Sequence, residues 1–347
     1  MTVPATSNRR ILLKNRPAGD PRPSDFEISE APIPRPSDGE ILCRTLWLSL
    51  DPYMRGRMKD VKSYAAPVEI GGVMVGGTVS EVVESNHPGF KAGDFVLGYG
   101  GWQTHHVARA AAKPGPFGPL KLDPKAAPIS TALGVLGMPG MTAYVGLLDI
   151  GQPKPGETVV VSAAAGAVGS AVGQLARIKG ARAIGVAGSP EKCDYVVKEL
   201  GFDACVSYRS PDLGGALKEA CPKGIDVYFD NVGGDVLNAV MPQLNPFARI
   251  PLCGHIAQYS ATELPPGPNL GVVVGMRVKI QGFIVSDHAD RLGDFLREAS
   301  AWVRDGRLKY HEDVADGLEN APQAFIGLLR GKNLGKQLVR VAPDPTR

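Results

Sequence analysis

The stretch Val159–Gly173 reads VVVSAAAGAVGSAVG, and its character changes twice along its length. Val159–Val161 is an apolar run of strand composition, residues 162–166 are small, and a helical pattern then continues to Ile178. In the context of a strand, a turn and a helix, Ala164-x-Gly166-x-x-Gly169 indicates dinucleotide binding, because small residues let the backbone approach a pyrophosphate held at the helix N-terminus. Taken alone, the motif also fits an ordinary strand–helix turn in any α/β domain.

The end of the next predicted strand, Ala183–Val186, bears on which nucleotide would bind. An NAD site normally places Asp or Glu there to bond the ribose 2′-hydroxyl. This chain has Gly188 instead, and Lys192 follows within one helical turn. A missing acid and a nearby base suit a 2′-phosphate, so the pattern favours NADPH over NADH. Lys192 also fits a plain solvent-exposed lysine, with Glu191 beside it to offset its charge.

Composition limits the class of protein. The 347 residues are 44% hydrophobic, enough for two domains with real cores. Charge is nearly balanced, with 38 basic and 35 acidic residues, which gives no argument for nucleic acid. The five cysteines form no CxxC pair and fit a reducing cytosol. Residues 1–10 lack the apolar core of a signal peptide, and prolines and glycines break the uncharged stretch Ala126–Leu148, so we expect a cytoplasmic protein without a membrane span.

The pattern along the chain indicates a β-rich region over residues 1–125, a crossover over 126–150 and alternating strands and helices from 155 to about 285. In the first region the strands are expected within Glu40–Leu48, Met74–Val83 and Phe95–Leu97. The alternation predicts an α/β doubly wound parallel sheet. Its predicted strands are Val159–Ser162, Ala183–Val186, Ala204–Val206, Val227–Asp230, Ile250–Cys253 and Ile280–Ile284, with helices near 167–179, 190–200, 212–220 and 235–244.

The last third of the chain adds a helix and a return to the first region. Residues 288–306 predict an amphipathic helix with a core-facing stripe of Leu292, Phe295, Leu296, Ala299 and Val303. The tail predicts a strand, the helix Ala321–Leu329 and a final strand, Gln337–Val341.

Polar or small residues follow two of the predicted strands, where such sheets bind ligands. They are Asn231 after the fourth strand and Cys253-Gly254 after the fifth. Asn231 can offer its amide to a ribose or a nicotinamide, and it equally fits a turn asparagine.

Several sequence blocks together indicate a family. They are LSLDPYMRGRM (Leu48–Met58), GGVMVGGTVSEVVES (Gly71–Ser85), GVLGMPGMTAY (Gly134–Tyr144), AAAGAVGS (Ala163–Ser170), FDNVGG (Phe229–Gly234), ELPPGP (Glu263–Pro268) and GKNLGK (Gly331–Lys336). With these blocks in order, the chain resembles the medium-chain dehydrogenase/reductase superfamily. Within it, the chain is similar to the zinc-independent, NADPH-dependent alkene reductases, which include the leukotriene B4 12-hydroxydehydrogenase/prostaglandin reductases and, nearest to this sequence, the bacterial curcumin reductases.

The resemblance implies a fold and an assembly. We expect a GroES-like β-barrel domain over residues 1–130 and 309–347, which would carry substrate and catalytic residues. A Rossmann domain over 131–308 would bind NADPH, and the protein would be a homodimer.

The resemblance also implies site residues. Tyr53 and Tyr259 would line the substrate site as catalytic residues. Cofactor contacts would come from Thr142, Ala165, Gly166, Ala167, Val168, Gly169, Gly188, Lys192, Tyr208, Asn231, Cys253, Gly254, His255, Ile256, Ala257, Gln258, Tyr259, Phe283, Ile284, Val285 and Asn333. His255 stands where the family usually has a small or apolar residue, which could change the polarity of the pocket. The other histidines (His87, His105, His106, His288 and His311) are expected on surfaces or in local hydrogen bonds.

No metal is expected. Zinc-dependent relatives have a ligating cysteine where this chain has Asp51, and their Gly-His-Glu falls on Gly72-Val73-Met74. Their four-cysteine structural lobe is also missing.

The predicted activity is NADPH-dependent reduction of the C=C bond of α,β-unsaturated ketones or aldehydes, with curcumin-like enones as candidate small-molecule substrates. Hydride would reach the β-carbon, and tyrosine hydroxyls, Tyr259 before Tyr53, would stabilise the enolate in place of a metal. A quinone reductase with the same cofactor and a non-catalytic NADPH-binding protein remain as alternatives.

Overall fold

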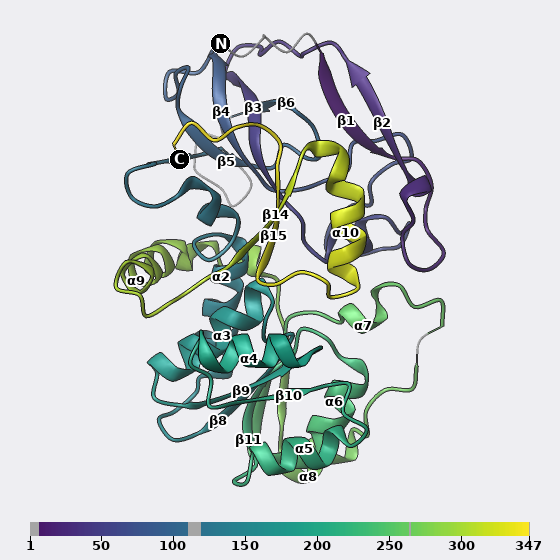
Figure 1. The fold of residues 1–347 in the computed structure, drawn as a ribbon, viewed down its shortest axis with the longest axis vertical. Helices are drawn as coiled ribbons and strands as arrows, with labels where there is room; N and C mark the ends of the chain where they lie inside the picture. The colour runs from purple at the N-terminus through teal and green to yellow at the C-terminus, as the bar shows by residue number, and fades with distance from the viewer. Residues whose placement is uncertain (1–6, 110–118, 264, 347) are drawn as a thin grey trace. The chain divides into compact units, whose positions relative to one another are not determined.

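The computed structural model describes residues 7–109, 119–263 and 265–346. The chain forms two compact units, whose strands and helices are drawn in Figure 1. The first unit comprises Met1–Leu133, Asp313–Asn333 and Gln337–Arg347, and the second comprises Gly134–Glu312 and Leu334–Lys336. The domain roles predicted from the sequence, with boundaries after residues 130 and 308, stay a prediction.

The second unit is built on a parallel sheet of six strands in the order β10-β9-β8-β11-β12-β13. The first strand in the chain, β8, lies in the middle of the sheet; β9 and β10 extend the sheet on one side, and β11, β12 and β13 extend it on the other. This is the arrangement of a doubly wound Rossmann sheet, so the predicted fold class is confirmed. The strands are β8 (Thr158–Ser162), β9 (Arg182–Ala187), β10 (Ala204–Ser207), β11 (Ile225–Phe229), β12 (Leu244–Leu252) and β13 (Lys279–Gly282).

Successive side chains of the central strands pack alternately into two separate cores, one on each face of the sheet. Val159 and Val161 pack in one core, whereas Val160 between them packs in the other. Because successive strand residues point to opposite faces, a strand that is apolar throughout must be covered on both sides. The run Val159–Val161 therefore explains why helices lie on both faces.

The helices of this unit divide between the two cores. The core with Val159 includes residues of α2, α3, α4 and α9, and the core with Val160 includes residues of α5, α6 and α8. The helices are α2 (Met138–Tyr144), α3 (Ala167–Ile178), α4 (Pro190–Lys198), α5 (Leu213–Ala220), α6 (Gly234–Val240), α7 (Ile256–Tyr259), α8 (Gly271–Met276) and α9 (Leu292–Arg304). The helix predicted from 288 thus begins at Leu292, after a 3-10 segment, and its most buried face adds Trp302 to Phe295 and Ala299.

The first unit is β-rich, as predicted. A sheet in the order β14-β15-β3-β4-β5-β7, with β6 also paired to β3, is accompanied by the antiparallel pair β1–β2. The elements are β1 (Asn8–Leu13), β2 (Phe26–Ala31), β3 (Glu40–Ser49), α1 (Met54–Arg57), β4 (Thr78–Ser85), β5 (Phe95–Gly98), β6 (His105–Arg109), β7 (Leu120–Leu122), β14 (Glu312–Asp316), α10 (Ala321–Leu329) and β15 (Lys336–Arg340).

The apolar run Met74–Val83 contains the start of a strand, as predicted. That strand, β4, begins at Thr78 and extends two residues past the run, to Ser85, and Gly76 just before it packs closely. A Cβ at Gly76 would come within 2.9 Å of Leu48 Cδ1. The C-terminal segment returns to this unit through Val339, which pairs with Leu48 in the sheet.

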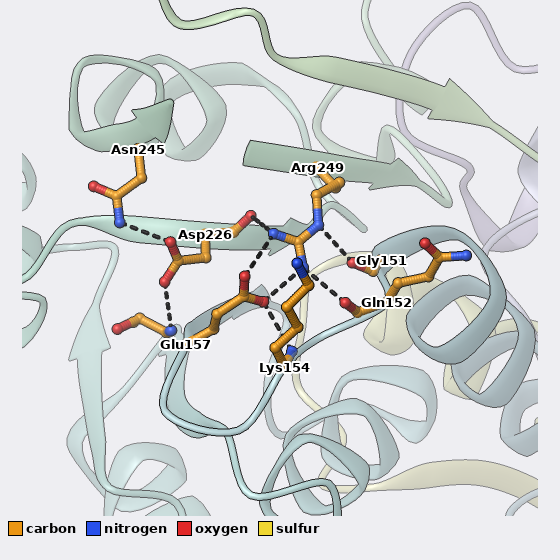
Figure 2. A network of polar contacts seen from close by, with 8 residues as sticks. Gly151, Gln152, Lys154, Glu157, Asp226, Asn245 and Arg249 are labelled. Carbon is orange, nitrogen blue, oxygen red and sulfur yellow. Dashed lines mark hydrogen bonds and ion pairs between the residues drawn. The ribbon is translucent and has the colours of Figure 1, made fainter. Parts of the chain in front are cut away.

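The amino ends of the Rossmann strands are tied together by Arg249, on β12 (Figure 2). Its guanidinium donates to the carbonyl oxygens of Gly151 and Gln152, each at 2.8 Å, and its Nη2 lies 2.6 Å from Glu157 Oε2. Asp226 on β11 accepts from the backbone N–H of Thr158 at 2.8 Å. This network fixes the strand ends opposite to those that carry the predicted nucleotide residues.

Among the described residues, none of the helices combines the length and the apolar character needed to cross a bilayer.

Candidate active site

The turn after β8 explains why alanine can stand in place of the first glycine of the motif. Ala164 is fully buried, and a Cβ built on Gly185 of the neighbouring strand would come within 2.8 Å of the Ala164 methyl group. Gly185 therefore provides the room that the family motif usually obtains at the first position. Gly169 allows close packing of α3 on the turn, since a Cβ there would lie 2.3 Å from the Ala163 carbonyl oxygen.

The same turn leaves the start of α3 without a side-chain cap. Gly166 is its N-cap residue and makes no side-chain hydrogen bond to the helix. By contrast, Ser189 caps α4 and Asp212 caps α5. The first backbone N–H groups of a helix have no partner inside the helix and carry partial positive charge. Residues Ala165–Gly169 thus form a backbone surface suited to an anionic group.

Two of the predicted 2′-phosphate residues, Gly188 and Tyr208, lie side by side at the end of β9, and Lys192 is on the helix that follows. Gly188 follows the strand directly, and a Cβ on it would lie 2.8 Å from the Tyr208 hydroxyl. Lys192 is on the first turn of α4, where its N–H donates to the Ser189 hydroxyl at 3.4 Å. Sequence reasoning missed Arg209, whose guanidinium carbon lies 5.8 Å from the Tyr208 ring centre. The signal for it was a second basic residue directly after the predicted tyrosine.

Asp230, which sequence reasoning also missed, organises the turn after β11. It is fully buried, and its Oδ1 accepts from the Tyr228 hydroxyl at 2.8 Å, from the N–H groups of Val232 at 2.9 Å and Gly233 at 2.8 Å, and from the Ser162 hydroxyl at 3.2 Å. Four donors on one oxygen fix the backbone of this turn tightly.

Asn231 is held by the strand next to it. Its N–H donates to the Ser162 hydroxyl at 2.9 Å, and its side-chain amide nitrogen donates to the Ser162 carbonyl oxygen at 2.8 Å. The amide that the sequence assigns to a ligand is therefore engaged in joining β11 to β8 in this structure.

The loop after β12 places Tyr259 over the strand end. A Cβ on Gly254 would lie 3.0 Å from the Tyr259 hydroxyl, so the glycine allows the phenol to approach the backbone. Burial raises the pKa of the Cys253 thiol to about 12, with a further contribution from the Asp230 charge. The Cys253 thiol is therefore protonated at neutral pH and is a poor nucleophile there.

His255 and the rest of this loop pack on the Asp230 turn. A Cβ on Gly233 would lie 3.1 Å from the His255 ring, and one on Gly234 would lie 3.3 Å from the Ala257 methyl group. Ile256, Ala257, Gln258 and Tyr259 form the short helix α7. The loop Cys253–Tyr259 and the Asp230 turn therefore form one packed edge.

The remaining predicted cofactor residues of the second unit are apolar or internally bonded. Thr142 is buried on α2 and its hydroxyl donates to the Met138 carbonyl oxygen at 2.7 Å. Phe283 contacts Phe229 edge to face, with ring centres 6.3 Å apart, and Ile284 and Val285 follow it.

Two predicted residues belong to the first unit. Asn333 is buried there, and the next residues, Leu334–Lys336, belong to the second unit. Tyr53 precedes α1, and its hydroxyl is hydrogen-bonded to that of Tyr99, a partner that the sequence did not indicate. Burial raises the pKa of Tyr53 well above its ordinary value, with added contributions from Tyr99 and the Asp51 charge. Both phenols are therefore protonated hydrogen-bond donors at neutral pH.

The histidine expectations need one correction. His87 bonds locally, with its Nδ1 accepting from the Gly89 N–H at 3.0 Å. His105 is buried but has a local partner in the Thr104 hydroxyl at 3.1 Å. His106 is neither exposed nor locally bonded through Nδ1, because β6 turns it into the interior, where burial lowers its pKa to about 4. It is a neutral core residue. Across the described ranges, no group of three or more His, Cys, Asp or Glu side chains is arranged to hold a metal ion.

The chain is similar to known oxidoreductases over most of its length. Residues 9–113 match a family described as the N-terminal domain of oxidoreductase, and residues 167–301 match one described as zinc-binding dehydrogenase. The chain is 53% identical to NADPH-dependent curcumin reductase of Escherichia coli, covering 97% of this chain and 98% of that protein. It is 41% identical to a tobacco NADP(+)-dependent 2-alkenal reductase, covering 97% and 98%.

A solved structure extends the likeness to three dimensions. CurA from Vibrio vulnificus in complex with NADPH is 50% identical and superposes with a TM-score of 0.92, covering 97% of this chain and 100% of that one. Identity at this level over both units shows common descent and not merely a shared fold. The chain belongs to the medium-chain dehydrogenase/reductase superfamily, in the branch that contains these reductases.

Proposed function

We propose that this protein is an NADPH-dependent reductase of the C=C bond in α,β-unsaturated ketones and aldehydes, curcumin-like enones among them. The observation that carries the proposal is the end of β9, where Gly188 stands in place of an acid, the Tyr208 hydroxyl lies against it, and Lys192 is on the first turn of the helix that follows. A carboxylate there would repel a 2′-phosphate, whereas the Tyr208 hydroxyl can donate a hydrogen bond to it and the charges of Lys192 and Arg209 attract it. The substrate class is supported by the relatives, a curcumin reductase and a 2-alkenal reductase.

The residues present fit the cofactor. The uncapped start of α3 would receive the pyrophosphate through the N–H groups of Ala167, Val168 and Gly169. Lys192, Tyr208 and Arg209 would receive the 2′-phosphate. Phe283, which the buried Phe229 supports from behind, and the loop after β12 would hold the nicotinamide end and exclude water from it.

The chain's own part in the reaction is electrostatic. When bound, NADPH supplies a hydride for the β-carbon of the enone. As the C=C bond is consumed, negative charge develops on the carbonyl oxygen, and a preorganised donor must stabilise it. The Tyr259 hydroxyl is the first such donor and the Tyr53 hydroxyl the second. A proton on the α-carbon completes the reduction.

Metal independence is part of the proposal. It rests on the residues found at the positions of the zinc ligands. Asp51 is buried and accepts a hydrogen bond from the Ser49 hydroxyl, which makes it part of the protein's own bonding network. The test is activity measured after prolonged dialysis against a chelator, with full activity expected.

Tyr259→Phe tests the donor role. Loss of one oxyanion donor costs about 100-fold in kcat, so we expect a fall of that order on an enone with the KM for NADPH unchanged. Tyr195→Phe, which removes a phenol on α4, is the matched control. A Tyr259→Phe rate within a factor of two of wild type would remove Tyr259 from the mechanism. Product analysis by mass spectrometry, with quinones in the same substrate panel, separates enone reduction from quinone reduction.

We also infer a homodimer. β13 is the last strand of its sheet and carries Ile280, which is 40% exposed. Leu270 and Val274, at the start and in the interior of the preceding helix α8, are exposed by 62% and 79%. An apolar edge of this kind is a liability unless another chain covers it. Light scattering after size exclusion should give twice the mass of one chain, and a monomer would contradict the inference.

A further inference from the structure

The starting observation is the direct hydrogen bond between the hydroxyls of Tyr53 and Tyr99. Tyr99 follows β5 directly, and Tyr53 lies on the segment between β3 and α1, so the pair joins two parts of the first unit that are 46 residues apart. A phenol has one proton to donate and can also accept. If Tyr99 donates to Tyr53, the Tyr53 proton is free to point at another acceptor.

The two phenols differ in how easily each could carry a negative charge. Burial raises the pKa of both, but that of Tyr99 only to about 12, because a hydrogen bond with Tyr53 stabilises the Tyr99 phenolate once its proton has left. The pKa of Tyr53 is raised further, with the Tyr99 bond and the Asp51 charge among the causes. Of the other groups that act on the pair, Asp51 and Tyr64 raise both pKa values and Arg57 lowers that of Tyr99. Charge is therefore less costly on Tyr99 than on Tyr53.

Tyr99 is also the phenol with access to water. It is 43% exposed, whereas Tyr53 is partly buried beside the core that contains Met54 and Leu50. A proton taken from the inner phenol can thus be replaced through the outer one.

We propose that Tyr99 is a positioning residue for the protonation step and passes its hydroxyl proton to Tyr53 as Tyr53 gives its own proton to the substrate. This rests on the proposed function, in which Tyr53 lines the substrate site. The Tyr53 O–H bond breaks as a C–H bond forms at the α-carbon of the enolate. At the same time the Tyr99 O–H bond breaks and a new Tyr53 O–H bond forms. The phenolate left on Tyr99 takes a proton from water, so the proton comes from solvent and no oxidant or reductant beyond the hydride donor is needed.

The relay avoids a cost that Tyr53 would meet alone. If the partly buried Tyr53 gave up its proton alone, burial would make the remaining charge costly, and the Asp51 carboxylate adds to that cost at both phenols. Handing the charge to the exposed partner moves it into water.

Tyr99→Phe is the test, because it keeps the ring and removes only the hydroxyl. We expect kcat on an enone to fall about tenfold or more, with the KM for the enone within a factor of two, since general-acid help is lost and binding is not. The solvent deuterium isotope effect on kcat should rise, and added small buffer acids should restore part of the rate. Tyr64→Phe, which removes the neighbouring phenol, should keep wild-type values of all three quantities.

A second substitution guards against a folding defect. Fluorotyrosine at position 99 keeps the hydroxyl and makes it more acidic, so the alkaline limb of the kcat profile should move to lower pH. If Tyr99→Phe kept the wild-type kcat and isotope effect, or if fluorotyrosine left the alkaline limb of the kcat profile in place, the relay would be overturned while the proposed function would stand. A wild-type enzyme that turns over no enone would overturn the proposed function and the relay with it.

Discussion

The backbone N–H of Gly335 donates a hydrogen bond to the carbonyl oxygen of Ala165, 2.8 Å away. The two residues are 170 positions apart in the chain, and Gly166 and Gly335 also pair as an isolated β-bridge. The backbone carbonyl of the predicted nucleotide turn is therefore held by the GKNLGK block near the end of the chain. The block thus holds the turn through a backbone hydrogen bond.

Replacing Gly335 should loosen the turn. Gly335 has φ +67°, and an added Cβ would lie 2.2 Å from the His311 carbonyl oxygen. Strain and overlap together should cost Gly335→Ala about 3 kcal/mol of stability and weaken NADPH binding. Gly331→Ala is the matched control, because Gly331 has φ +63° but open space around its Cβ position. Thermal unfolding and cofactor titration would check both, and equal effects of the two substitutions would contradict a special role for position 335.

Lys192→Ala should raise the KM for NADPH about tenfold or more while leaving that for NADH nearly unchanged, because only the former carries the 2′-phosphate. Lys198→Ala on the same helix is the control, since Lys198 is paired with Asp194 on the surface at 2.7 Å. Steady-state kinetics with both nucleotides measures the selectivity. A parallel change for NADPH and NADH would show that Lys192 does not contact the phosphate.

Asp230→Ala should destabilise the second unit by on the order of 3 kcal/mol or more, because it leaves several buried donors, among them the N–H groups of Val232 and Gly233, without an acceptor. Tyr228→Phe removes only one of the hydrogen bonds and should cost about 1 kcal/mol. Calorimetry on both variants tests the ranking. If the smaller substitution proved the more harmful, Asp230 would not be the centre of the network.

The Arg249–Glu157 pair predicts a pH dependence of stability. Burial alone would raise the pKa of Glu157, but hydrogen bonds from Arg249 and from the Lys154 N–H lower it below the ordinary 4.5. A carboxyl with a lowered folded-state pKa contributes stability above its unfolded pKa and loses it as the pH falls through the folded value. Wild type should therefore exceed Glu157→Gln in melting temperature at neutral pH, with the gap closing below about pH 4.5. If the difference in melting temperature were the same at neutral pH as below about pH 4.5, the ionised pair could not be its cause.

Local patterns were enough to predict the Rossmann sheet. The apolar run Val159–Val161 and the small residues after it determine a buried strand, a tight turn and a helix, because strand period, turn chemistry and helix periodicity are properties of neighbouring residues. The predicted helix over 190–200 and the one over Ala321–Leu329 followed from the same signals. The positions of Gly188 and Lys192 at the end of the second strand were readable in the same way.

The tertiary structure alone decided which residues meet. It turned Gly185 toward Ala164, engaged the Asn231 amide with Ser162, buried His106 and paired Tyr99 with Tyr53. The three contacts join segments separated by many residues. Strand order and packing decide these partners and the burial of His106, and neither produces a periodic pattern in the sequence. The sequence by itself therefore determined the nucleotide-binding framework, whereas the bond from Ser162 to Asp230 and the tyrosine pair exist only because folding brings distant side chains within hydrogen-bonding distance.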